Sequence, residues 1–520
     1  MEEKEKISGG SAAAGIAAEA AAVEDAAINT DIEDAAACAK NAELKKEYGE
    51  YLAAAASVDL KSCQAAAEAG DSSAMTILAL KYLTGTGAPE DVTAAAGWFI
   101  KAAGKGNVAA MKEIAQLYFR GLGVEQDFRK SLAYNLKAAE AGDADAMNTL
   151  GILYADGAGI ERSDEKAMEW FTAAAAAGDR DACGIIAGKY ESGAGVAKDE
   201  KAAMAWYKKA AAMGDADAMS IVGTKYERGS GVKKDLREAL AWQLKAAEAG
   251  SSEAMKILGY MHFHGLGTAK NAGKALEWLL KAASLGDTQA MDVIGTMYLA
   301  GTGVRQNYAH AREWYFKAAA LGDTEAMRAL AGMYLSGRGV KKSPKDTLKW
   351  YRKAAAAHDS IAMVSIGSMY LDGNGVKQNY AKALDWYEMA AELGNDEAMK
   401  NIGSMYSLGL GVRPDFDMAM EMCSKAAALG NAEAMYIIGY FYEKGQGRRQ
   451  DYAKALEWYE RAAAHGSDSA MAALGWLYET GSGVAHDRDA ALKWYRRAVR
   501  LGNAQAAMGL ERLGAAGAKA

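Results

Sequence analysis

The sequence predicts an all-α fold, an α/α superhelical solenoid of twelve helix-turn-helix repeats, each 36 residues long, with degenerate caps at both ends. Three periodic features support this prediction. An Ala-Met pair recurs at multiples of 36 residues, a Gly-x-Gly motif recurs twelve times, and Asp, Asn or Ser always follows the second glycine by four positions. Such self-similarity at a fixed period is the signature of repeat architectures.

The Ala-Met pair sets the register of the repeat. Cys183 replaces the methionine once, and Ala507 lies one period after the last methionine, so that no residue is inserted or deleted between positions 75 and 507. An array this regular is also what a recent duplication or an engineered chain would show. The methionines of this column are Met75, Met111, Met147, Met219, Met255, Met291, Met327, Met363, Met399, Met435 and Met471.

The glycines mark where helices end. Because glycine adopts positive φ without strain, the Gly-x-Gly motif is expected to end one helix and turn the chain. The Asp, Asn or Ser that follows is then the N-cap of a second helix, and Pro344 directly after Ser343 suits a first helical position. Another glycine column, with His358 as its only exception, is followed at once by a further Asp, Asn or Ser. Each repeat is thus predicted to be an antiparallel pair, helix A then helix B, with a one-residue corner to the next repeat.

The apolar columns predict how these helices pack. In one helix A, Ala362, Met363, Ile366, Gly367 and Tyr370 fall on one face at helical spacing. The Gly/Ala column of Gly367 is expected to let a neighbouring helix approach closely.

Helix B carries Trp in ten repeats, with Tyr134 and Met422 in the other two. A bulky residue that recurs in every repeat is interpreted as core. The Trp column, the Met column and the Tyr column of helix A are therefore all predicted to be buried.

These columns resemble the Sel-one-like repeat (SLR) family, which is related to the tetratricopeptide repeat. The matching pattern is A-M-x-x-[LI]-[GA]-x-x-Y-x-x-G-x-G-V-x-x-D-x-x-K-A-x-x-W-Y-x-K-A-A-x-x-G, over residues 71–510. A tetratricopeptide repeat fits less well because its period is about 34 residues and it lacks this glycine loop. The resemblance implies a right-handed superhelix that acts as an adaptor for protein complexes. It implies no catalytic residue, because the family shares none.

Four segments are predicted along the chain. Residues 1–38 are acidic and Ala-rich and are expected to be partly disordered. Residues 39–70 are interpreted as a degenerate capping repeat, with Gly49 and Gly70 in register but Ser62 where the tryptophan belongs. Residues 71–502 form the twelve repeats. Residues 503–520 are interpreted as a C-terminal capping helix and tail, with Glu511 in the Gly/Ala column.

Charge and composition limit the partners. Residues 1–70 hold six Lys and Arg against fourteen Asp and Glu, whereas the rest of the chain holds 54 against 53. A neutral solenoid argues against nucleic acid as a partner, because nucleic acid requires a basic surface.

No apolar run reaches the ~18 residues of a membrane span. The acidic start and Glu19 argue against a secretory signal. With four non-periodic cysteines, these features favour the cytoplasm, the alternative being a periplasmic or secreted protein exported by an unrecognised route.

The chemical motifs searched for are missing from the sequence. Gly273-Lys274 lacks the rest of a phosphate-binding loop, and there is no CxxC, HExxH or GxSxG. His262 and His264, two residues apart on a helix, are expected to point to different faces. We therefore predict no catalytic, cofactor or metal site.

The predicted function is a non-enzymatic scaffold that binds a protein or peptide along its groove. The alternative is a hydrolase-like or small-ligand-binding protein acting on a cell-wall-type substrate, as a few members of the family resemble.

One cluster of aromatic residues is the candidate partner site. At about 100° per residue, the columns of Thr76 and Leu80 fall opposite the core face of helix A, where the groove is expected. Six repeats place small residues in the Leu80 column, but two adjacent repeats place three aromatic side chains in these two columns, and such side chains are typical anchors of a binding hot spot. The small residues are Gly188, Thr224, Thr296, Gly332, Ser368 and Ser404. The alternative is that the aromatics are buried against the C-terminal cap. A fourth aromatic stands apart from these three. The candidate residues are Tyr436, Tyr440, Trp476 and Tyr260.

Overall fold

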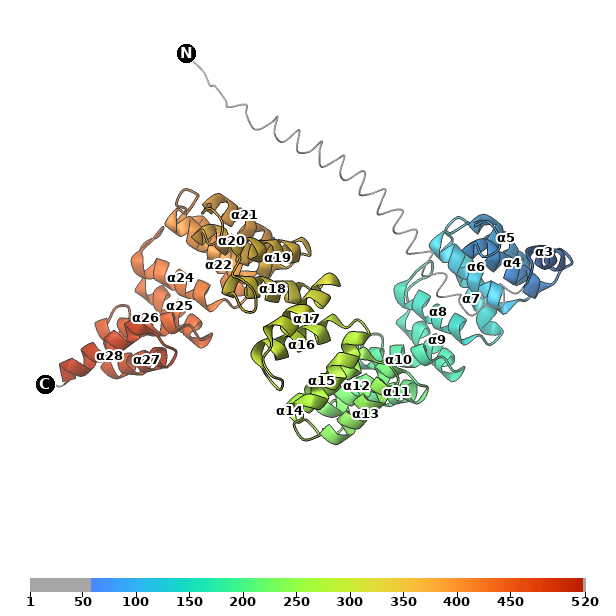
Figure 1. The fold of residues 1–520 in the computed structure, drawn as a ribbon, viewed down its shortest axis with the longest axis horizontal. Coiled ribbons are helices and arrows are strands. Elements are labelled where there is room, and N and C mark those ends of the chain that lie inside the picture. The colour runs from blue at the N-terminus through green and yellow to red at the C-terminus, as the bar shows by residue number, and fades with distance from the viewer. Residues whose placement is uncertain (1–57, 518–520) are drawn as a thin grey trace, which may run out of the picture. The chain divides into compact units, whose positions relative to one another are not determined.

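The computed structural model describes residues 58–517. The predicted N-terminal segment, residues 1–38, and the first part of the predicted capping repeat, residues 39–57, lie outside the described residues. Over the described range the chain forms 26 helices and no strand, so the all-α repeat fold is confirmed (Figure 1).

The contacts between helices divide the chain into two units, which meet in the sequence between Ser251 and Ser252. In each unit helix A packs against helix B of the same repeat, and helix B packs against helix A of the next (Figure 1). The helices of the first unit are α3 (Leu60–Glu68), α4 (Ser72–Thr84), α5 (Val92–Gly104), α6 (Val108–Arg120), α7 (Phe128–Glu140), α8 (Ala144–Asp156), α9 (Asp164–Ala176), α10 (Arg180–Ser192), α11 (Glu200–Ala212), α12 (Ala216–Arg228) and α13 (Leu236–Glu248).

The second unit continues the same alternation, with even-numbered helices as helix A and odd-numbered helices as helix B. Its helices are α14 (Ser252–His264), α15 (Ala272–Ser284), α16 (Thr288–Ala300), α17 (Tyr308–Ala320), α18 (Thr324–Ser336), α19 (Pro344–Ala356), α20 (Ser360–Asp372), α21 (Tyr380–Glu392), α22 (Asp396–Leu408), α23 (Phe416–Ala428), α24 (Ala432–Lys444), α25 (Tyr452–Ala464), α26 (Asp468–Thr480), α27 (Arg488–Arg500) and α28 (Ala504–Gly517).

The Gly-x-Gly loop links the two helices of a repeat as predicted. Gly121 caps α6 in the left-handed conformation, at φ 68°. Asp127 caps α7 by accepting a hydrogen bond from the Lys130 N–H at 3.0 Å. Two constraints, the backbone conformation and the space available, require a glycine at the second position of the loop. Gly123 has φ 68°, and a Cβ atom there would lie 2.3 Å from the carbonyl oxygen of Val92 in the preceding helix B.

The corner between repeats is longer than predicted. Three non-helical residues, not one, separate α17 from α18, of which Gly322 takes φ 91° and Asp323 is the N-cap. The two extra residues are the C-cap of helix B, Leu321, and the N-cap of the next helix A, Asp323, which lie on either side of the glycine. His358 takes the glycine position of the next corner at φ 60°, the one positive φ of a non-glycine residue among residues 58–517.

The Gly/Ala column of helix A allows the close helix packing that the sequence predicted. A Cβ atom at Gly367 would lie 2.6 Å from the ring of Tyr387, twenty residues later in helix B. The same clash would arise for Gly151 with Phe171 at 2.5 Å, Gly295 with Tyr315 at 2.7 Å, Gly439 with Tyr459 at 2.6 Å and Gly475 with Tyr495 at 2.6 Å. In these five repeats an aromatic ring therefore occupies the volume left free by the glycine.

The prediction that the Trp column forms the core is wrong for most repeats. Nine of the ten tryptophans in this column are half-buried, and the tenth, Trp350, is buried. The column that follows Trp holds the ring packed on the glycine, as at Phe171, Tyr315 and Tyr387, which are at most 1% exposed. Two adjacent positions on a helix point about 100° apart, so both cannot face the core, and the second position does.

The exposed face of the tryptophan ring carries a cation in most repeats. In eight of the ten, the Lys or Arg three residues later places its charge over the indole at 3.9–4.8 Å from the ring centroid. Such contacts are typically worth about 0.5–1 kcal/mol at exposed sites. The tryptophans of this column thus lie at the edge of the core, with one ring face covered by a cationic side chain.

Two glycines in helix A provide a matched test of this packing. Gly367→Ala should lower stability by about 1–3 kcal/mol, because the new methyl group overlaps Tyr387. Gly332→Ala should raise stability by up to about 1 kcal/mol, because a Cβ there meets nothing within 4 Å and alanine favours the helix. Urea unfolding followed by circular dichroism measures both. Equal effects of the two substitutions would contradict the proposed packing.

Candidate functional site

The structure brings three of the four predicted site residues together. Tyr436 and Tyr440 lie one turn apart on α24 with ring centroids 6.5 Å apart, and Trp476 lies on α26. The Lys444 ammonium joins the two helices, at 5.6 Å from the Tyr440 ring centroid and 5.7 Å from that of Trp476. These four residues are called the aromatic cluster below.

The members of the aromatic cluster differ in exposure. Tyr440 is 36% exposed, whereas Tyr436 and Trp476 are half-buried. Tyr436 stacks on Tyr459 with centroids 5.6 Å apart, and Trp476 lies 6.5 Å from Tyr452. Tyr436 and Trp476 therefore also support helix packing, and Tyr440 is the ring most available to a ligand.

The charge state of the aromatic cluster follows from one carboxylate. Glu443 lies 2.6 Å from Lys444 and accepts a hydrogen bond from the Tyr459 hydroxyl at 2.6 Å. The hydrogen bond with Glu443 raises the pKa of Lys444. Burial, followed by the contact with Glu443, raises the pKa of Tyr459. The cluster therefore presents an ammonium group, paired with Glu443, beside its aromatic rings.

Tyr260 stands apart from this cluster, on α14. It is 54% exposed, and its ring lies 4.3 Å from that of His264. His262 is buried, burial lowers its pKa, and its Nδ1 has no hydrogen-bond partner. Within residues 58–517 there is no group of three or more His, Cys, Asp or Glu side chains that could hold a metal ion.

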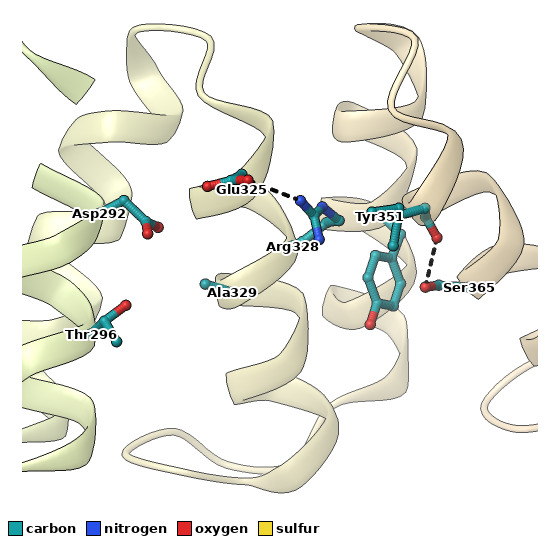
Figure 2. A pocket seen from close by; sticks show the side chains of 8 residues that line it. Asp292, Thr296, Glu325, Arg328, Ala329, Tyr351 and Ser365 are labelled. Atoms are coloured by element: carbon teal, nitrogen blue, oxygen red, sulfur yellow. Dashed lines mark hydrogen bonds and ion pairs between the residues drawn. The ribbon is translucent and has the colours of Figure 1, made fainter. Parts of the chain in front are cut away.

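Sequence reasoning missed a second site, a pocket of about 490 Å³ on helices α16, α18 and α20. Figure 2 shows Asp292 and Thr296 on one side, Arg328 at the centre and Tyr351 of α19 opposite. The pocket is lined by Asp292, Thr296, Glu325, Arg328, Ala329, Tyr351, Ile361 and Ser365.

Asp292 is unusual when the same column is compared between repeats. In that column Lys112 contacts the N-cap Asp143 of the next repeat at 3.1 Å, and Arg328 contacts Asp359 at 3.0 Å. Asp292 instead places a carboxyl group towards the N-cap residue Asp323. This substitution was visible in the sequence, but the groove columns were compared for size and not for charge.

The environment of Asp292 raises its pKa to about 6. Burial is the main cause, repulsion by Asp323 and Glu325 adds to it, and Arg328 opposes it. Arg328 is already paired with Glu325 at 3.6 Å and with Asp359 at 3.0 Å. A positively charged group entering the pocket would therefore find an uncompensated carboxyl group.

Comparison with known families shows what the repeat is. The Sel1 repeat profile matches twelve consecutive segments that together span most of the chain. The matched residues are 72–107, 108–143, 144–179, 184–215, 216–251, 252–287, 288–323, 324–359, 360–395, 396–431, 432–467 and 468–503. The chain belongs to the Sel1 repeat family.

Solved structures similar to this Sel1 repeat protein include two bacterial relatives. The protective antigen c5321 of uropathogenic Escherichia coli, described as an SLR fold, is 27% identical with a TM-score of 0.50, over 88% of this chain and 93% of that one. A Sel1 repeat protein of Oxalobacter formigenes is 30% identical with a TM-score of 0.47, over 60% of this chain and 90% of that one. A search of curated proteins gives no match.

The raised pKa of Asp292 gives the Sel1 repeat protein a testable pH dependence. The folded state holds this proton up to pH about 6, whereas an unfolded aspartate loses it near pH 3.8. Stability is therefore lost as the pH rises between these values. One pKa unit corresponds to about 1.4 kcal/mol, but this half-exposed carboxyl is screened by solvent. Asp292→Asn should thus raise stability at pH 7.5 by about 1 kcal/mol, and by less at pH 4.5.

Urea unfolding of both proteins at the two pH values measures this difference. Asp292→Lys is a second variant, which introduces at position 292 the positive charge that Lys112 and Arg328 carry in the same column of other repeats, and it should also stabilise the fold at pH 7.5. A gain for Asp292→Asn that is the same at both pH values would contradict the assigned titration.

Proposed function

We propose that this Sel1 repeat protein is a non-catalytic scaffold that binds a protein segment along the exposed face of its A helices. The observation that carries the proposal is the aromatic cluster, in which Tyr440 is exposed beside the charge of Lys444. Exposed aromatic rings next to a cation are the usual anchors of protein interfaces, because they bury a large area for little loss of conformational entropy.

The position of the Asp292 pocket also supports binding along the exposed face of the A helices. Its carboxyl group has no cation like those that Lys112 and Arg328 supply from the same column of two other repeats, so it would favour a lysine or arginine of the bound segment. The pocket and the aromatic cluster both lie in the second unit, and apart from Tyr351 of α19 their residues belong to even-numbered helices. The proposed partner is therefore a segment with an aromatic or aliphatic anchor and a basic residue.

The carboxyl groups near this pocket support binding more than hydrolysis. Two-carboxylate hydrolases require a pair of free carboxyl groups flanking the scissile bond. Here Asp323 is used as an N-cap, since it accepts a hydrogen bond from the Ala326 N–H at 2.8 Å, and Glu325 is paired with Arg328.

No helix of residues 58–517 is long and apolar enough to cross a membrane.

The location proposed for the scaffold is the cytoplasm. Cys63, Cys183 and Cys423 are buried and unpaired, which supports a reducing compartment. Burial raises the pKa of each of these thiols, so none of the three is poised as a nucleophile.

Tyr440→Ala is the sharpest test of the proposed function. Partner capture by the immobilised full chain from a lysate of the source organism, quantified by mass spectrometry, should fall at least tenfold, as expected for a hot-spot residue. The melting temperature should change by no more than about 2 °C, because the ring is exposed. Adding Trp476→Ala should abolish capture but also lower stability, because that ring is half-buried.

Leu408→Ala is the matched control, since Leu408 is 69% exposed and lies outside the cluster. It should leave both partner capture and melting temperature unchanged. Equal capture by wild type and Tyr440→Ala would contradict the assignment of the cluster, and equal loss in Leu408→Ala would show that the loss is not specific.

A further inference from the structure

Helix α23 departs from the repeat pattern at two adjacent positions. Met422 stands in the Trp column, and Cys423 stands in the next column, where most repeats place an aromatic ring. Cys423 is fully buried, with its sulfur 2.5 Å from the position of a Cβ on Gly403. Two large rings are thus replaced by a thin flexible side chain and a small one in the same helix.

A pocket of about 380 Å³ lies beside this helix. It is formed by α21, α22 and α23, and its lining includes Glu388, Met399, Tyr406, Met418, Met422 and Lys425. Its volume is within the range of small-ligand sites, about 300–1,000 Å³. Three methionines give it a soft, polarizable wall that adapts to planar rings.

Other repeats show what fills this position when the tryptophan is present. Trp350 packs edge-on against Phe316 of the preceding helix B, with centroids 5.2 Å apart. The Lys353 ammonium covers the same indole at 4.6 Å from its centroid. Phe316, Trp350 and Lys353 lie two repeats before Glu388, Met422 and Lys425, all three of which line the pocket. The pocket is therefore the site of the missing indole.

The cation that would cover an indole is already in place. In the next repeat Arg461 pairs with Glu457 at 2.6 Å while lying over Trp458 at 4.8 Å from the ring centroid. Lys425 makes the equivalent pair with Glu421 at 2.7 Å. Because the pair and the ring contact coexist around Arg461, the contact with Glu421 leaves Lys425 free to cover a ring in the pocket.

The other repeat without a tryptophan fills its own position. Tyr134 stacks on Tyr118 with centroids 6.0 Å apart, and Lys137 lies 5.6 Å from the Tyr134 ring centroid. An aromatic ring beneath a cation is thus conserved even there, and among the twelve repeats Met422 alone is a non-aromatic residue in this column.

We propose that the pocket beside Met422 binds the tryptophan side chain of a protein partner, with the indole beneath Lys425. The partner's identity as a protein rests on the proposed function, whereas the affinity of the pocket for an indole does not. Glu388 and Glu392 both line the pocket, and Glu388 places a carboxyl group where other repeats carry Phe316, Lys208 or Arg352. The tryptophan is therefore flanked by basic residues, which complement these two carboxylates.

The experiment uses N-acetyl-5-fluoro-L-tryptophanamide as the probe and follows its ¹⁹F line width in the presence of the full chain. The wild type should broaden the line with a Kd on the order of 1 mM, as expected for a fragment of this size. Met422→Trp should abolish the broadening and raise the melting temperature, because the chain then fills its own pocket. Lys425→Ala should weaken binding several-fold while leaving the fold intact.

Two controls make the result specific. N-acetyl-L-leucinamide, which has no ring to lie beneath the cation, should compete poorly with the probe. Tyr440→Ala should bind the probe as the wild type does, so a failure of the proposed function at the aromatic cluster remains distinguishable from a failure of the pocket. If Met422→Trp does not fold, Met422→Phe replaces it. No broadening at several millimolar probe, or equal broadening by the wild type and the filled variant, would overturn the proposal.

Discussion

The fold depends on one repeated contact, in which a residue with little or no side chain in helix A receives a ring from helix B twenty positions later. Gly367 and Tyr387 show how tight it is, because a single added methyl group would lie 2.6 Å from the ring. The close approach holds the two helices of a repeat together. The second glycine of each loop, such as Gly123 against Val92, then packs one repeat on the preceding helix B.

Because most repeats share this framework, sites of recognition are expected where repeats depart from it. Three departures lie in the second unit. Tyr440 and Trp476 stand in a column where many repeats carry small residues, Asp292 is the one acidic residue of its column, and Met422 stands in the tryptophan column. Each departure removes a group that the chain otherwise supplies or adds one that the fold does not require. A binding partner can supply the missing group or cover the added one, which is why we place function at these positions.

The sequence was sufficient to predict the repeat, its two helices, both N-caps and the close packing at Gly367, because each of these depends on local rules that recur twelve times. It was not sufficient to decide which of two adjacent aromatic columns faces the core, since a turn of about 100° separates them and both recur with the repeat. The pockets beside Asp292 and Met422 were missed for a different reason. Each arises from the absence of an expected side chain, and only the surrounding helices show that the space stays open.

The central claim is that a partner docks on the A-helix face at the aromatic cluster. Site-specific photocrosslinking tests it most directly, with benzoylphenylalanine placed at position 440 and, in a second protein, at position 429, where Leu429 is 58% exposed at the corner after a helix B. The account predicts a crosslinked partner from position 440 and none from position 429. A partner crosslinked from position 429 and not from position 440 would contradict it.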